Sequence, residues 1–172
     1  MKILLLHSST DGHTIRIMHH IADHLAGRAT CETVDLNPQP DVTIKDYDRV
    51  IVGASIRYGK FNEKMYEFVC RHKEDLEAVN AAYFGVNLAA KKPGKDDPET
   101  SPYFKKFMKT SPWHPRDKAL FAGVLNYSLY SFFDRNMIRF IMKITGGPTD
   151  PKTDEVFTNW QAVEDFASRI VG

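Results

Sequence analysis

Long apolar runs and cysteines are both scarce in this sequence. No stretch approaches the roughly 18 apolar residues of a membrane-spanning helix, and residues 3–6 are too few for the core of a signal peptide. Cys31 and Cys70 form no Cys-x-x-Cys motif and cannot make a disulfide scaffold. We therefore expect a cytoplasmic protein of 172 residues with an ordinary apolar core, in which both cysteines are small buried residues.

Net charge is nearly absent as well. The chain carries 23 basic and 22 acidic side chains, which excludes a protein that is polyanionic or polycationic as a whole. The charges are unevenly placed, because residues 1–90 have a net charge of −2, residues 91–145 of +6 and residues 146–172 of −3. A basic middle segment of this kind is typical of a solvated face, or of a surface for nucleic acid, anionic lipid or an acidic substrate.

Short apolar runs alternate with amphipathic helical patterns along the chain. We expect strands at 2–7, 32–36, 49–53, 82–88 and 119–125, and helices at 14–26, 62–78, 101–110 and 158–171. Thr158 and Gln161 have the spacing of a capping box. Strands that are apolar throughout indicate a parallel sheet covered on both faces, so the fold class is α/β with a doubly wound, five-stranded sheet. Residues 1–172 form one domain in this interpretation, with insertions at about 89–103 and 126–157.

Three loops follow strands at the edge where a doubly wound sheet binds its ligand. The first is rich in hydroxyls and precedes a helix, where free backbone N–H groups and the helix dipole favour an anion such as phosphate; it contains Ser9, Thr10, Asp11, Gly12, His13 and Thr14. The same residue types also cap an ordinary helix. The loop is neither a Walker A motif nor Gly-x-Gly-x-x-Gly. Because a carboxylate would repel a phosphate, we expect the Asp11 side chain to point away from it.

The second loop, 53–60, brackets an aromatic residue with glycines, so that Tyr58 could stack on a flat ring or could be a surface tyrosine in a plain turn. Its small residues permit a close approach of a ligand to the backbone. The third loop, 85–89, is less specific. His20 and His24 are spaced like a metal-binding pair, but no third ligand is evident, so we expect a solvated helix face and no metal.

Residues 131–145 also have a helical pattern, within the second insertion. Phe133, Met137, Ile141 and Ile144 fall on one face, widened by Phe132 and Phe140, beside the basic residues Arg135, Arg139 and Lys143. This pattern fits an ordinary helix packed on the sheet, and it also fits a basic amphipathic helix at a membrane surface.

Several stretches together resemble the flavodoxin-like, quinone-dependent protoporphyrinogen oxidase (dehydrogenase) family of bacteria. The first loop resembles the flavodoxin phosphate loop, with Asp11 where a hydroxyl residue is usual. The resemblance runs nearly end to end, and its most specific part is the run from Gly53 to Gly59 together with the helical insertion. The matching stretches are 9–14, 47–50, 53–59, 86–88, 92–93, 134–135, 137–138, 141–143, 146–150 and Trp160.

The resemblance implies a flavodoxin-like fold, an FMN cofactor, and oxidation of protoporphyrinogen IX to protoporphyrin IX in haem biosynthesis, with menaquinone or ubiquinone accepting the electrons at the cytoplasmic face of the inner membrane. No nucleic-acid partner is implied. The implied cofactor-binding residues are those of the first loop together with Ala54, Ser55, Ile56, Arg57, Tyr58, Gly59, Val86, Asn87 and Leu88. Charge alone suggests that Arg57, Lys91, Arg135, Arg139 and Lys143 contact substrate or an anionic membrane surface.

Three other functions share parts of this pattern. A flavodoxin-type electron carrier would share fold and FMN, but carriers of this type tend to be acidic. An FMN-dependent NAD(P)H:quinone reductase remains open, since such enzymes often lack a nicotinamide-binding motif. A receiver-type signalling module would need an acidic cluster after its first strand, where this chain has His7 and Ser8. The sequence identifies no general base and no oligomeric state.

Overall fold

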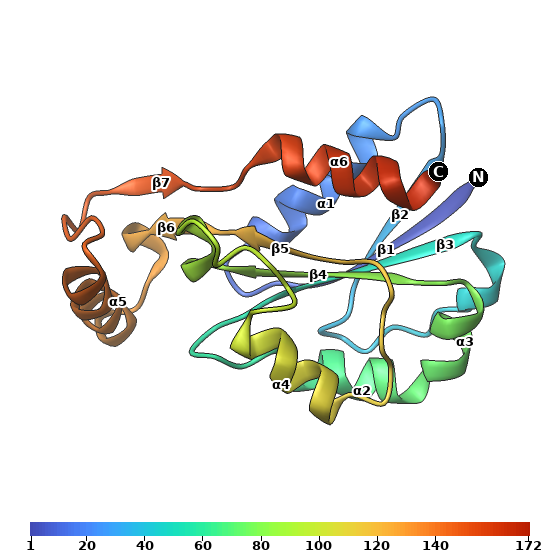
Figure 1. Cartoon of the computed structure of the whole chain (residues 1–172), viewed down its shortest axis with the longest axis horizontal. Helices are drawn as coiled ribbons and strands as arrows, with labels where there is room; N and C mark the ends of the chain where they lie inside the picture. Colours follow the sequence, from blue (N-terminus) through green and yellow to red (C-terminus); the bar gives the residue numbers. More distant parts are fainter.

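The computed structural model describes residues 1–172, and its centre is a five-stranded parallel sheet (Figure 1). The strand order is β2-β1-β3-β4-β5, and every neighbouring pair is parallel. The strands are β1 (Lys2–Ser8), β2 (Thr30–Asp35), β3 (Arg49–Ser55), β4 (Ala82–Asn87) and β5 (Lys118–Ala122). This topology confirms the predicted doubly wound sheet.

Helices cover both faces of the sheet (Figure 1). One face carries α1 (His13–His24) and α6 (Trp160–Val171), and the other carries α2 (Glu63–Arg71), α3 (Lys73–Ala78) and α4 (Pro102–Thr110). Successive strand residues alternate between two apolar clusters, since Leu4 belongs to the cluster under α2 and α4 while Leu5 belongs to the one under α1 and α6. Double coverage therefore explains why the strands are apolar without interruption.

Several predicted boundaries differ from the structure. The helix expected over 62–78 is divided at His72, whose ring packs on Phe68 with 4.4 Å between ring centroids. The strand expected over 119–125 ends at Ala122, and the chain then leaves the sheet. The capping box is wrong: Asn159 caps α6 by accepting a bond from the Ala162 N–H, while the buried Thr158 hydroxyl donates to the Ala122 carbonyl.

The second insertion forms a separate subdomain beyond the carboxyl ends of the strands, at the end of the molecule opposite both termini (Figure 1). It contains a two-stranded antiparallel sheet and one long helix. Its elements are β6 (Val124–Asn126), the 3-10 turn η3 (Tyr127–Leu129), α5 (Phe132–Thr145) and β7 (Asp154–Val156). Two further 3-10 turns are η1 (Ile44–Asp46) and η2 (Ala89–Lys91). No helix combines the length and the apolar character that crossing a membrane demands.

Helix α5 does not pack on the sheet with the predicted apolar face. Its buried residues are Ile138 and Met142, which join a small cluster with residues of the β6–η3 segment. Most other large apolar side chains of the helix are exposed: Phe132 (82%), Phe133 (71%), Phe140 (64%), Ile141 (40%) and Ile144 (68%). The interpretation of α5 as an ordinary helix packed on the sheet is therefore wrong.

The structure also changes the expectations for two histidines of α1 and for the two cysteines. His20 and His24 face Glu164 of α6, at 3.0 Å and 3.9 Å, so they lie between helices and not on a solvated face. No cluster of three His, Cys, Asp or Glu side chains is suited to a metal ion. Neither cysteine is buried, because Cys31 is half-buried in β2 and Cys70 is exposed on α2.

Candidate functional site: a cavity at the carboxyl edge of the sheet

A cavity of about 600 Å³ lies where the loops after β1, β3 and β4 meet the second insertion. This volume is within the range of cofactor sites. Most of the predicted cofactor-binding residues line it, and they are Ser9, Thr10, Asp11, His13, Thr14, Ser55, Ile56, Arg57, Tyr58, Gly59, Val86, Asn87 and Leu88. The insertion adds Tyr130 and several residues of α5, which the predicted site did not include.

Three predicted contributions differ from the structure. Gly12 does not line the cavity, but its left-handed φ of +82° turns the chain into α1. Ala54 is fully buried in the core. Gly53 makes room for neighbouring core side chains and not for a ligand, since a Cβ there would lie 2.3 Å from Phe84 and 2.6 Å from Met18.

The first loop leaves the start of α1 free to bind an anion. No side chain caps this helix, so the interpretation of the loop as an ordinary capped helix start is wrong. The Ser9 hydroxyl instead accepts a bond from the Gly12 N–H within the loop, at 3.0 Å. The Thr14 hydroxyl is buried, lines the cavity and has no hydrogen-bond partner. A buried polar group without a partner is costly, so the Thr14 hydroxyl is available to a ligand in the cavity.

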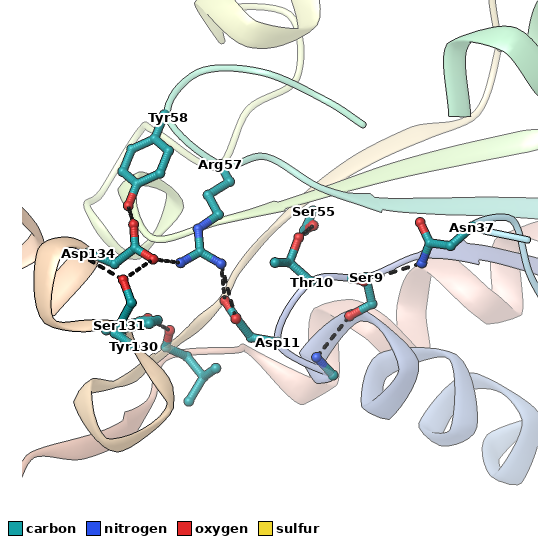
Figure 2. A network of polar contacts seen from close by, with 12 residues as sticks. Ser9, Thr10, Asp11, Asn37, Ser55, Arg57, Tyr58, Tyr130, Ser131 and Asp134 are labelled. Atoms are coloured by element: carbon teal, nitrogen blue, oxygen red, sulfur yellow. Dashed lines mark hydrogen bonds and ion pairs between the residues drawn. The ribbon is translucent and has the colours of Figure 1, made fainter. Parts of the chain in front are cut away.

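Asp11 points toward Arg57, as Figure 2 shows, and Arg57 in turn joins two segments that are far apart in sequence. Its guanidinium lies 3.1 Å from the Asp11 carboxylate and 3.1 Å from that of Asp134, in the first turn of α5. The carboxylate of Asp11 is therefore neutralised and occupied, which agrees with the expectation that it would turn away from a phosphate. Arg57 links the first loop to the insertion.

Tyr58 completes this network (Figure 2) and lines the cavity. It has a left-handed φ of +51°, and its hydroxyl donates to Asp134, which also accepts a bond from the Ser131 hydroxyl at 2.9 Å. These bonds from Tyr58 and Ser131 lower the pKa of Asp134, while burial and the bond to Asp134 raise the pKa of Tyr58. Sequence reasoning gave Asp134 no role, because no local pattern places the start of α5 beside Arg57.

His13 lies at the first position of α1 and is buried. Its Nε2 is 2.6 Å from the Thr158 hydroxyl, which donates its own proton to Ala122. The imidazole therefore donates through Nε2, and its Nδ1 carries the lone pair. Burial lowers the pKa of His13, and Arg16 lowers it further, so the neutral ring is favoured near neutral pH.

The third loop adds one more polar group without a partner. Asn87 ends β4, and its side-chain oxygen accepts a bond from the Ala90 N–H at 2.8 Å. Its side-chain NH₂ group is buried and unbonded beside the cavity. Asn87 therefore has a fixed donor group available beside the cavity.

The basic residues proposed on charge alone separate into two groups. Arg57 and Lys91 line the cavity, together with Lys92 and Lys95, which the prediction did not name. The three basic residues of α5 do not line it. Arg135 donates to the carbonyls of Tyr127 and Tyr130, Arg139 donates to that of Thr149, and Lys143 is exposed. The two arginines thus hold the insertion together.

Comparison of the sequence with known proteins shows which family this chain belongs to. A family model described as a flavodoxin domain matches residues 4–152. A Leishmania major protein named protoporphyrinogen IX dehydrogenase [quinone] is 45% identical over 97% of this chain and 73% of its own length. The Escherichia coli K12 protein of the same name is 39% identical over 99% of this chain and 94% of its own length. This chain belongs to the quinone-dependent protoporphyrinogen IX dehydrogenase family.

A solved flavodoxin structure shares the fold of this chain. Oxidised flavodoxin 1 from Bacillus cereus has a TM-score of 0.52 and 15% identity, covering 99% of this chain and 97% of its own. This likeness shows the fold alone. The flavodoxin domain and fold suggest that the chain binds a flavin, and family membership excludes the receiver-type alternative.

Proposed function

We propose that the protein oxidises protoporphyrinogen IX to protoporphyrin IX in haem biosynthesis, with FMN as cofactor and menaquinone or ubiquinone as electron acceptor. The observation that carries this proposal is the 39–45% identity, over nearly the full chain, to relatives named for this reaction. The oxidation proceeds in three two-electron steps, so three quinones become quinols as the porphyrinogen loses its six hydrogens. Bound FMN supplies the two-electron chemistry, and the chain binds and orients its substrates.

The start of α1 is suited to the FMN phosphate. The backbone N–H groups of this helix are free of side-chain caps, and the helix dipole adds attraction for an anion. The hydroxyl of Thr14 is a ready donor because it has no other partner. Ser9 and Thr10 add hydroxyls on the same loop, and Asp11 does not oppose the phosphate because Arg57 holds it. The residues present therefore fit a phosphate-bearing flavin.

The flavin ring is proposed to lie against Tyr58, with residues 55–59 as its wall and the Asn87 side chain as donor to a polar edge of the ring. Tyr58→Ala should change the absorption spectrum and the affinity of bound FMN. Tyr58→Phe is the matched control, because it keeps the ring and removes only the hydroxyl bond to Asp134. If Tyr58→Ala leaves spectrum, redox potential and affinity unchanged, the ring lies elsewhere.

The reaction itself is tested by anaerobic turnover. Purified protein reconstituted with FMN is given protoporphyrinogen IX plus a quinone in one assay, and NADPH plus the same quinone in another. We expect porphyrin fluorescence and quinol in the first assay and no quinone reduction in the second. The opposite pattern would indicate an NAD(P)H:quinone reductase, and inactivity in both would indicate an electron carrier.

We also propose that α5 attaches the protein to the cytoplasmic face of an anionic membrane. The helix exposes five large apolar side chains at one end of the molecule. Its one acidic residue, Asp134, is paired with Arg57, while Lys143 is exposed and free of ion pairs. A basic residue near an anionic leaflet contributes about 1 kcal/mol, and each inserted aromatic adds apolar transfer energy. A quinone dissolved in the bilayer would then lie close to the cavity.

Vesicle co-sedimentation tests this attachment. Wild type should bind anionic liposomes more strongly than neutral ones, and less strongly at high salt. Phe133→Ser/Phe140→Ser should lose most of the binding, because it removes two of the exposed aromatic rings proposed to insert into the membrane. The variant should still fold, because neither ring is part of the core. Reversing Arg135 or Arg139 would be a poorer test, since both hold backbone carbonyls. Equal sedimentation of wild type and the double variant would contradict the proposal.

A further inference from the structure

We infer that residues 91–95, the end of η2 and the turn that follows it, bind the propionate carboxylates of the tetrapyrrole substrate. This lysine turn carries Lys91, Lys92 and Lys95, with Lys91 as the principal contact. This inference rests on the proposed function and adds to it the end of the cavity at which the substrate's negative charges lie. Three features of the cavity support it: the balance of charge, the surroundings of Lys91 and the separation from the first loop.

The charge balance of the cavity wall leaves these lysines without counter-ions. Asp11 is the only acidic side chain in the wall, and it is paired with Arg57. Arg57 is fully compensated, because it also pairs with Asp134. None of the three lysines forms an ion pair, so their charges are the positive surplus of the cavity.

Lys91 is held in place without an anion. It is half-buried, and its ammonium contacts the Met142 sulfur at 3.6 Å and the Phe157 ring at 4.5 Å from the centroid. Gly147 leaves room for the ammonium, since a Cβ there would lie 2.9 Å from it. A thioether and one ring satisfy an ammonium poorly, so a carboxylate arriving from the cavity would gain a charge-assisted bond.

The lysine turn is separate from the proposed phosphate site. The first loop follows β1 and the lysine turn follows β4, and β3 lies between these strands in the sheet. Two strand spacings amount to about 10 Å. One cavity therefore offers an anion site at a helix start and a second cationic site near β4 and α5, which suits a cofactor phosphate and a dicarboxylate bound together. Lys92 and Lys95 also line the cavity and are exposed, so they are available to the second carboxylate.

The test pairs a lysine substitution with a substrate that lacks charge. Binding of protoporphyrin IX and of its dimethyl ester to the FMN-loaded protein is measured by fluorescence, and KM is measured for the corresponding porphyrinogens. Lys91→Met should weaken binding of the diacid and raise its KM, each about tenfold. A tenfold change lies between the effect expected for losing an exposed ion pair and that for losing a buried, charged hydrogen bond. The ester should bind equally to both proteins, kcat and FMN content should change little, and Lys91→Arg should restore diacid binding.

Lys105→Met is the matched control, because Lys105 is an exposed lysine of α4 outside the cavity wall. Equal losses for diacid and ester would overturn the inference, since Lys91 would then act only through its contacts with Met142 and Phe157. Unchanged diacid binding, with loss of sedimentation on anionic vesicles, would also overturn it and assign the lysines to lipid headgroups. Absence of turnover in the wild type would contradict only the proposed function, because porphyrin binding does not depend on the reaction.

Discussion

The five-stranded sheet buries apolar clusters of 21 and 15 residues on its two faces, whereas the second insertion buries a cluster of 5. Phe84 in β4 is fully buried, while Phe133 on α5 is 71% exposed. Polar bonds take a larger part in holding the insertion, through Arg57 to Asp134, Arg135 to Tyr127 and Arg139 to the carbonyl of Thr149.

This difference assigns different tasks to the two regions. Apolar burial makes the sheet a rigid platform for the loops at its carboxyl edge. Individual polar bonds contribute about 0.5–1.5 kcal/mol each, so we expect the insertion to open more readily than the sheet. A cavity with one rigid wall and one wall that opens more readily would suit the proposed function, in which a large tetrapyrrole must enter and leave.

The largest effect on stability should follow from removing a large buried side chain from the core of the sheet. Phe84→Ala should lower the free energy of unfolding by about 3–5 kcal/mol, because the ring is removed from a fully packed cluster. Phe133→Ala, the matched change on α5, should stay within about 0.5 kcal/mol, because its ring is exposed. Urea denaturation followed by circular dichroism measures both. Similar losses would show that the two regions are not held differently.

The next effect concerns the anion site on the rigid wall. Thr14→Val should weaken FMN binding by about 1.5–3 kcal/mol, or roughly 10–150-fold, because a hydrogen bond to a charged phosphate is lost. Thr14→Ser keeps a hydroxyl and should bind FMN nearly as wild type does. Titration of FMN into the apo-proteins, followed by flavin fluorescence, gives both constants. A constant unchanged in Thr14→Val would mean that Thr14 has a structural role alone.

The sheet was predictable because its signals are local. The apolar runs that become β1, β3 and β4 are continuous, and the hydroxyl-rich loop and the Gly53–Gly59 run stand directly after strands. Most of the cavity wall follows from those positions by the rule for parallel sheets. The errors at His72 and Ala122 arose where an apolar pattern continued across a change of direction in the chain.

The insertion was less predictable because its contacts are tertiary. An amphipathic pattern shows that α5 has an apolar face, but it does not say whether that face meets the sheet or solvent. The same limit hid Asp134, which gains its role only when α5 lies beside Arg57. Charge alone grouped Lys91 with Arg135 and Arg139, and only the structure separates a cavity residue from two that bond to nearby carbonyls.

Weakening the polar link between the two regions should loosen the insertion selectively. Asp134→Ala removes the acceptor shared by Arg57, Tyr58 and Ser131, so α5 should open more often. Hydrogen–deuterium exchange should speed up in α5 and remain unchanged in β3 and β4. Glu155→Ala, an exposed acidic residue of β7, is the control and should leave exchange in α5 unchanged. Faster exchange throughout the sheet would contradict a local link.

The smallest effect on stability should come from lowering the pH. It should destabilise the sheet and its covering helices rather than the insertion. Burial lowers the pKa of His7, His13 and His72 from the ordinary value of 6.5, and residues 124–157 contain no histidine. Below pH 6.5 the unfolded chain therefore binds more protons than the folded chain does at these sites. Their contribution to stability is complete above pH 6.5 and decreases as the pH falls from there through the lowered native pKa values.

Thermal unfolding at pH 7.5 and 5.5 measures this contribution, and Tm should be lower at the acidic pH. His13→Gln keeps a donor toward Thr158 but cannot titrate, so its Tm should fall less between the two pH values than that of wild type. His114→Gln, at an exposed position, is the control and should match the wild-type difference.

Hydrogen–deuterium exchange measures the insertion separately. After correction for intrinsic exchange rates, the local opening of α5 should be equal at both pH values, because no histidine lies in the insertion. An equal fall of Tm in His13→Gln and wild type would remove His13 from this account, and acid-induced opening of α5 alone would reverse the comparison between the two regions.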